Sequence, residues 1–482
     1  MVLLLGITIS CETEKLEPAS TVLFSDLVVF QTPSRIAQQV NGLYSGSSIK
    51  NGNFLGGRYF IYSDIRGEEF INVRGNASTG LNVWNFTMVE SSGPSASIWQ
   101  YAYASINQVN TFLAGLEANK DKFVPPNFPV NYSVVVNQYI AEARFVRAVA
   151  YHYLLQNFAK SHLATGDGSS PGLPLRLNAE STGENNDLAR STVAEVYTQI
   201  LADLDFAEAN VPLTYTTDLL NVSRAHRNSV IAFKTKVYLA MGKWNEVINE
   251  ANRIVSPTAP FKASSGVPHT LESTFDGVFA APQLTKENIF SMIFTNQDNP
   301  GTQNQLGFYW QSSGGAEYYL NPTGIVSDPN WKPTDSRRLQ IVTSGGNQWL
   351  NKKFPTPTPY TDKVQIIRYS EVLLNLAEAR VRSTSTVDAQ AIDLLNAVRG
   401  RSDVSTQWNA GDFADSNALL STILHERQIE FLGEGMRSLD VMRLNLPFPA
   451  KGSVPSVAPT DPTYLWPIPD TELRTNALMI RN

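Results

Sequence analysis

Apolar residues recur at helical spacing over much of the chain. The clearest case begins with Thr192-Val-Ala-Glu195, a capping-box pattern that satisfies the first free backbone N–H groups of a helix. The apolar positions that follow have the period of one helical face: Val193, Val196, Tyr197, Ile200, Leu201, Leu204 and Ala207. A second helix is predicted over 139–159, where apolar side chains occupy so much of the circumference that the helix must lie between neighbours.

Two stretches have the pattern of helix pairs joined by a tight turn. Within 232–251 the helical spacing is interrupted at Gly242 and resumes at Trp244, and 370–383 with 389–402 predict another pair. Each pair resembles the core of a tetratricopeptide-like repeat. Because one such repeat cannot bury its own apolar face, several must stack. We therefore predict a mainly α fold.

Helical periodicity is lost over 45–95 and about 256–365, which are rich in Pro, Gly, Asn, Thr and aromatic residues. Only short strand-like pieces occur there, such as ENIFSMIF at 287–294. Loops held by a rigid scaffold commonly carry function. We therefore expect both irregular regions to fold over one side of the helical array as a ligand-binding subdomain.

Composition narrows the class of partner. The 482 residues include 38 basic and 44 acidic side chains, a net charge of −6, and the charged fraction is 17% against about 25% in average proteins. No run of lysine and arginine appears, so the sequence offers no electrostatic footprint for nucleic acid. The uncharged polar surface fits hydrogen bonding to neutral polyols, and it equally fits plain solubility.

The single cysteine, Cys11, follows a short apolar run at 2–10. The run is far shorter than the ~20 residues of a membrane-spanning helix but has the length of the apolar part of a signal peptide. It resembles a bacterial lipoprotein signal, which predicts a signal peptide over 1–10, a lipid anchor on Cys11 and an acidic tether over 11–19. The alternative is a cytosolic N-terminus with a chance cysteine.

A charged corner is predicted near the C-terminal end. Within 419–443, Leu420, Ile423, Leu424 and Phe431 have helical spacing, and Gly433 and Gly435 can supply the left-handed residue that ends a helix. The corner's charged residues are Glu426, Arg427, Glu430, Glu434, Arg437, Asp440 and Arg443. We interpret them as a structural salt-bridge network.

No catalytic constellation stands out. Residues 168–172 fit the G-x-S-x-G string, but a helix precedes the serine and prolines follow, so we predict a loop. The histidines are scattered, without metal-ligand spacing, and His152 lies on an apolar helix face and is expected in the core. Glu426 and Glu430 form a carboxylate pair, but nearby arginines suggest that both are neutralised. We expect no enzyme activity, no metal and no cofactor.

Aromatic residues in the irregular regions are the candidate ligand contacts. Sugar rings carry C–H patches that lie flat on Trp or Tyr, while polar side chains fix the hydroxyls. The candidates are Trp84, Tyr309, Trp310, Tyr318, Tyr319 and Trp331. Tyr309 and Trp310, flanked by Gln303, Asn304 and Gln311, form the first choice.

Several segments together resemble the SusD/RagB family, surface lipoproteins of Bacteroidetes that capture nutrients. They follow in the family's order from about residue 20 to the end and include 97–113, 141–159, 419–443 and 466–476, and it is their joint order that is specific. The resemblance implies a single domain over 20–482 with about four helix-pair repeats and loops forming the ligand face. It also implies a non-enzymatic protein on the outer face of the outer membrane.

The resemblance further implies capture of oligosaccharides and their delivery to a SusC-like TonB-dependent outer-membrane transporter. Two alternatives stay open: a RagB-like protein that captures peptides or glycopeptides, and a helical-repeat scaffold that binds only proteins.

Overall fold

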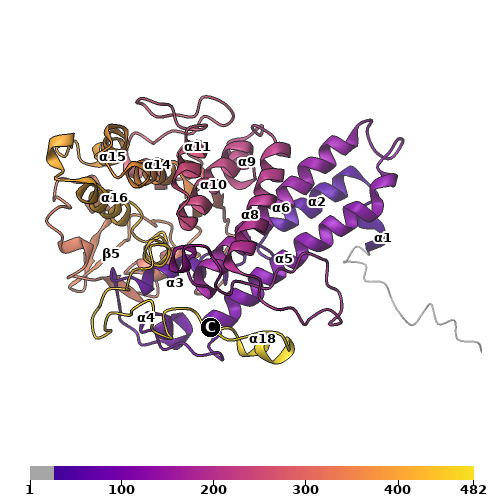
Figure 1. Cartoon of the computed structure of the whole chain (residues 1–482), viewed down its shortest axis with the longest axis horizontal. Coiled ribbons are helices and arrows are strands. Elements are labelled where there is room, and N and C mark those ends of the chain that lie inside the picture. Colours follow the sequence, from indigo (N-terminus) through magenta and orange to yellow (C-terminus); the bar gives the residue numbers. More distant parts are fainter. Residues whose placement is uncertain (1–25) are drawn as a thin grey trace, which may run out of the picture.

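A computed structural model describes residues 26–482, and Figure 1 shows that the fold is mainly helical, which confirms the predicted class. The predicted signal peptide, the predicted lipid anchor at Cys11 and the predicted acidic tether lie outside the described residues. The long helices of the array are α5 (Gly93–Asn119), α6 (Tyr132–Phe158), α8 (Val193–Asn210), α10 (Arg227–Met241), α11 (Trp244–Ala251), α14 (Tyr369–Thr384), α15 (Ala389–Ser402) and α16 (Ser416–Glu430).

Shorter helices fill the connections. They are α1 (Asp26–Val29), α2 (Pro33–Leu43), α3 (Arg58–Arg66), α4 (Leu81–Trp84), α7 (His162–Thr165), α9 (Asp218–Ser223), α12 (Phe275–Phe279), α13 (Leu306–Trp310), α17 (Arg437–Arg443) and α18 (Asp470–Thr475), with 3-10 turns at Ala77–Thr79, Lys120–Lys122, Ile325–Ser327, Ser336–Gln340 and Ala410–Asp412.

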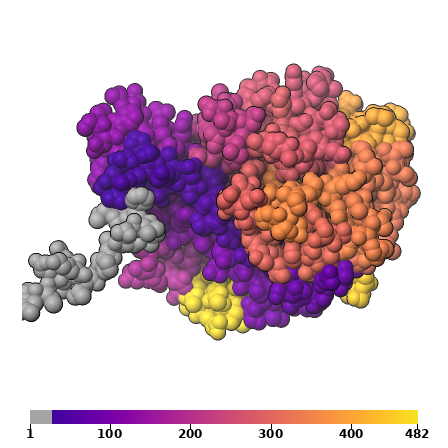
Figure 2. Space-filling view, turned by 180° about the vertical axis from the view of Figure 1, so that it is seen from behind, coloured from indigo at the N-terminus to yellow at the C-terminus, as the bar shows by residue number. Residues whose placement is uncertain are grey.

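The array runs through the molecule in sequence order. α6 packs between α5 and α8, α10 contacts α8 and α11, α11 contacts α14, and α14 contacts both α15 and α16. α5 and α6 therefore lie toward one end of the molecule, and α14, α15 and α16 lie at the other (Figure 1); the view from behind shows the same separation (Figure 2). Successive helix pairs in contact are consistent with the tetratricopeptide-like expectation.

The predicted local signals are present. Thr192 Oγ1 accepts from the Glu195 backbone N–H at 3.2 Å, and the Glu195 carboxylate accepts from the Thr192 N–H at 2.7 Å. Gly242 ends α10 with φ of 70°, a left-handed conformation that costs glycine little.

Three antiparallel strand pairs organise the irregular regions. β1 (Phe70–Asn72) pairs with β3 (Tyr318–Leu320), β2 (Asn288–Met292) with β6 (Val364–Arg368), and β4 (Val342–Ser344) with β5 (Asn347–Trp349). The β2–β6 pair is buried along its whole length and closes the base of the second irregular region. The β1–β3 pair joins the first irregular region to the second.

The first irregular region is more helical than its sequence pattern indicates, because α3 lies within it. Every residue from Tyr59 to Arg66 is buried. Its polar residues Ser63, Asp64 and Arg66 are buried together with its apolar ones, so from Tyr59 onward the helix has no face exposed to solvent. In the described residues, no helix is both long and apolar enough to cross a membrane.

Candidate functional site

The structure buries five of the six predicted aromatic contacts. Trp310 and Tyr309 are 0% exposed, Tyr318 1%, Trp331 2% and Trp84 7%. Each therefore lacks the exposed ring face that a ligand platform requires, and the expectation is corrected for all five. Only Tyr319 is partly exposed.

Four of the buried aromatics form one layer beneath the β1–β3 pair. The Trp310 ring stacks on Phe70 with centroids 4.1 Å apart, and Tyr318 lies against both Tyr309 and Trp310. Trp84 joins the layer through its indole N–H, which donates to the Phe70 carbonyl at 2.8 Å. Trp331 lies elsewhere, with the Arg338 guanidinium 4.4 Å from its ring centroid. The layer is a rigid foundation for the surface above it.

On the other side of the pair, three residues make a partly exposed surface that we call the Tyr319 face: Ile71, Val73 and Tyr319. Tyr319 lies opposite Ile71 in the strand register, so the two side chains share the outer side of the pair. The Tyr319 ring is 6.2 Å from Trp349 of β5. Val73 is 44% exposed, and Arg74 donates to the Gly315 carbonyl at 3.2 Å.

Phe308 and Tyr360 form a second partly exposed aromatic pair. Their rings meet edge to face at 6.3 Å, and Gly315 approaches the Phe308 ring so closely that a Cβ there would lie 2.4 Å from it. The Tyr319 face and this pair both come from the two irregular regions, which the strand pairing brings together. Half-exposed rings can bind a ligand that is apolar on one side and rich in hydroxyl groups at its edge.

A second hollow, of about 460 Å³, lies between α5, the segment 174–187 and α18. The Trp99 ring lies 4.9 Å from Tyr103, and its N–H donates to Glu472 at 3.2 Å. Arg176 donates to Glu180 at 2.9 Å and lies 3.6 Å from Glu472. Burial alone would lower the pKa of Arg176, but these carboxylates outweigh it and raise the pKa. The charged side chains that line this hollow are thus paired with one another.

This hollow was not predicted from the sequence. A signal was present, because Trp99, Tyr103 and Asn107 recur every four residues and so share one face of α5.

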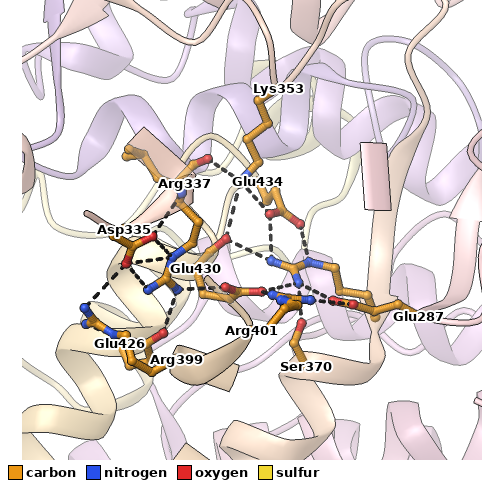
Figure 3. Close-up of polar contacts among 12 residues, drawn as sticks. Glu287, Asp335, Arg337, Lys353, Ser370, Arg399, Arg401, Glu426, Glu430 and Glu434 are labelled. Carbon is orange, nitrogen blue, oxygen red and sulfur yellow. Dashed lines mark hydrogen bonds and ion pairs between the residues drawn. The ribbon is translucent and has the colours of Figure 1, made fainter. Parts of the chain in front are cut away.

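The charged corner is a buried ionic network, as predicted (Figure 3). Glu430 accepts from Arg337 at 2.8 Å, from Arg368 at 2.6 Å and from Arg401. Glu426 accepts from Arg337 and from Arg399, both at 2.6 Å. Both glutamates are fully buried.

Further ion pairs continue the network beyond Glu426 and Glu430. Glu434 binds Lys353 at 2.7 Å, and Asp440 binds Arg427 at 3.0 Å. Arg437 donates to Glu68, which connects α17 to the first irregular region.

The pKa shift of Glu430 fits a structural role for the corner. Burial by itself would raise the pKa of Glu430, but Arg401, Arg368 and Arg337 outweigh burial and hold that pKa well below its usual range. A general acid in glycoside hydrolysis needs a raised pKa and a cleft around it. This carboxylate has the opposite shift and is enclosed by protein.

The other motifs that could suggest catalysis are also structural. Residues 168–172 lie in a loop after α7, without the strand–serine–helix geometry that G-x-S-x-G requires. His152 is 1% exposed and packs edge-on against Phe233 at 5.3 Å, which confirms that it belongs to the core. Within 26–482 no group of three His, Cys, Asp or Glu side chains could hold a metal ion.

Two family models and a solved structure that resemble this chain are all described as SusD-like or starch-binding. The model of the SusD family matches residues 290–482, and the model described as starch-binding associating with outer membrane matches 17–239. A crystal structure of a SusD superfamily protein from Bacteroides fragilis is 31% identical, with a TM-score of 0.81 over 94% of this chain and 99% of that one.

More distant relatives agree in fold. The SusD-like protein P38 of Formosa agariphila is 22% identical over 85% of this chain and 84% of its own length. A laminarin binding SusD-like protein of known structure is 21% identical, with a TM-score of 0.70 over 94% of this chain and 99% of that one. With a relative above 30% identity aligned over nearly its full length, the chain belongs to the SusD/RagB family.

Proposed function

We propose that this protein is a cell-surface glycan-binding protein that captures oligosaccharides. It is attached to the outer membrane by a lipid on Cys11, faces the exterior, and delivers its ligand to a SusC-like TonB-dependent transporter. In this proposal it binds without transforming the ligand, so it is not an enzyme and needs no cofactor.

Family membership supports the ligand class. One matching family model is described as starch-binding and associated with the outer membrane, and one structural relative is described as laminarin binding. Both polymers are neutral glucans, which bind through aromatic stacking and hydrogen bonds without charge pairing. The net charge of −6 and the low charged fraction of this chain fit such a ligand.

The Tyr319 face is the observation on which the proposed site rests. It presents the partly exposed ring of Tyr319 on the outer side of the β1–β3 pair, and the same two irregular regions carry the partly exposed rings of Phe308 and Tyr360. Because the rings rest on a buried aromatic layer, little ordering is needed when a ligand binds, and preorganisation of this kind favours affinity.

Titration calorimetry tests the ligand class. The Cys11→Ala protein, which cannot be lipidated, is titrated with β-1,3-gluco-oligosaccharides, malto-oligosaccharides and a tryptic digest of mixed proteins. Heat with an oligosaccharide but not with the digest is the expected result. Heat only with the digest would support the peptide-capturing alternative, and heat with none would favour the protein scaffold.

A further inference from the structure

Trp408 differs from the other tryptophans of the described chain. Trp84, Trp99, Trp310, Trp331, Trp349 and Trp466 are buried in the core. Only Trp244 and Trp408 are partly exposed. Trp244 packs against the α10–α11–α14 contact, beneath the Arg382 guanidinium. Trp408 instead lines a hollow of about 370 Å³.

The hollow lies in the α15–α16 connection, and we call it the Trp408 hollow. It is lined by Lys332, Ser405, Thr406, Gln407, Trp408, Asp412, Phe413, Ala418 and Thr422. Two of the lining residues are aromatic, Trp408 and the buried Phe413. The rim is polar, and the side chains of Lys332, Gln407 and Asp412 are exposed.

The tryptophan is held in place before any ligand arrives. The Asn396 side chain bonds both backbone groups of Trp408, donating to its carbonyl at 2.8 Å and accepting from its N–H at 2.9 Å. The Arg399 guanidinium lies 5.3 Å from the ring centroid, within range of a cation–π contact. Arg399 is itself paired with Glu426 and so belongs to the buried ionic network.

The connecting loop is fixed as well. Asp403 accepts from the hydroxyls of Ser405 at 2.7 Å and Thr406 at 2.6 Å. Asn409 and Asp412 form a reciprocal cap that orders the next turn. A surface aromatic whose loop and ring are both fixed loses little conformational freedom on binding, which is the property of a binding platform rather than of a mobile surface residue.

We propose that the Trp408 hollow is a second sugar-binding site, separate from the Tyr319 face, which takes a single pyranose ring such as the end of an oligosaccharide. Its volume lies at the lower end of the ~300–1,000 Å³ range of small-molecule sites, and one tryptophan offers area for one ring. Lys332 and Gln407 supply hydrogen-bond donors, and Gln407 and Asp412 supply acceptors, for ring hydroxyls. The inference extends the proposed function by a second contact with the same class of ligand.

Fluorine NMR of the Cys11→Ala protein labelled with 5-fluorotryptophan tests the site directly. The Trp408 resonance is assigned by its loss in Trp408→Phe, and that of Trp244 by its loss in Trp244→Phe. The probes are the methyl glycosides of glucose, galactose and mannose, N-acetylglucosamine and glucuronic acid. We expect at least one sugar to shift the Trp408 resonance saturably, while the Trp244 resonance, the matched partly exposed control, stays in place.

Two outcomes would overturn the proposal: no sugar moves the Trp408 resonance, or the Trp244 resonance moves in parallel with it. If an oligosaccharide binds, Trp408→Ala should weaken its affinity about tenfold without a comparable loss in melting temperature. The Tyr319→Ala protein separates the two sites. If its oligosaccharide affinity is unchanged, the proposed Tyr319 site fails, whereas a sugar response at Trp408 in that variant would still support the second site.

Discussion

Arg368 donates to Glu430 over 2.6 Å, although Arg368 ends β6 and Glu430 ends α16. The same guanidinium also binds Glu434 at 2.9 Å and Glu287 at 2.7 Å. One arginine thus connects the base of the second irregular region to the last helix of the array. The ionic network holds the loop-bearing part of the molecule on its scaffold.

Glu430→Gln should therefore destabilise the protein. Three arginines would lose their shared carboxylate in a fully buried position, and breaking a buried ion pair commonly costs ~3–5 kcal/mol. Thermal unfolding should show a clearly lower melting temperature, while ligand affinity of the folded fraction stays unchanged. The control is Asp470→Asn, which removes an exposed pair with Arg474 and should have little effect. An unchanged melting temperature with lost binding would mark Glu430 as functional.

Trp310→Ala should also lower the free energy of unfolding, and not only the affinity for a ligand. The ring is fully buried and stacked on Phe70, and truncating a core tryptophan typically costs ~3–5 kcal/mol. Chemical denaturation of the variant measures this loss. A melting temperature equal to that of the parent protein would contradict the packing described above.

Tyr319→Ala should show the reverse behaviour. Its ring is partly exposed on the outer side of β3, so truncation should change the melting temperature little. If the Tyr319 face binds the glycan, a contact of this kind is worth about 2 kcal/mol, or roughly thirtyfold in affinity. Calorimetry with the best oligosaccharide measures the change, and Tyr101→Ala, another partly exposed tyrosine, is the control. Equal affinities in the two variants would exclude Tyr319 as a contact.

Stability should fall in mild acid partly because of His152. Burial, with Lys236 nearby, lowers its pKa to about 3, whereas an unfolded histidine has a pKa of ~6.5. As the pH falls below 6.5, His152 becomes protonated in the unfolded chain but stays neutral in the folded protein. The free energy of unfolding therefore falls. Between pH 7 and 5 this amounts to ~2 kcal/mol. In denaturant titrations, the free energy of unfolding of His152→Phe should fall less between pH 7 and 5 than that of the parent protein. An equal fall in the two proteins would refute this role of His152.

Cys11→Ala should release the protein from the membrane fraction. A lipid anchor with several acyl chains binds stably, at ~0.8 kcal/mol per buried CH₂, where a single chain is marginal. Fractionation of cells that express the parent and the variant is the measurement, and a Cys11→Ala protein that still sediments with outer membranes would rule out the anchor. Mass spectrometry of the parent should find the mature chain beginning at a modified Cys11.

The sequence by itself determined the features that depend on neighbours within a turn or two of helix. The Thr192–Glu195 capping box, the turn at Gly242 and the charge density of 426–443 all follow from local spacing. The partners of that charge density do not, because Arg337, Arg368 and Arg399 come from distant segments. α3 was missed for a different reason: it is only nine residues long, shorter than the window over which helical periodicity can be recognised.

Tertiary structure decided which aromatics are exposed. Tyr318 and Tyr319 are adjacent and chemically identical, yet successive strand residues point to opposite faces, so one is buried and the other is not. Which face meets the core depends on the register of β3 against β1, a contact between the two irregular regions. Trp408 is likewise held in place by Asn396, by Arg399 and by the conformation of its loop. The periodic pattern of the sequence predicts none of these contacts. Composition supplied the aromatic rings, and long-range packing determined which of them face the solvent.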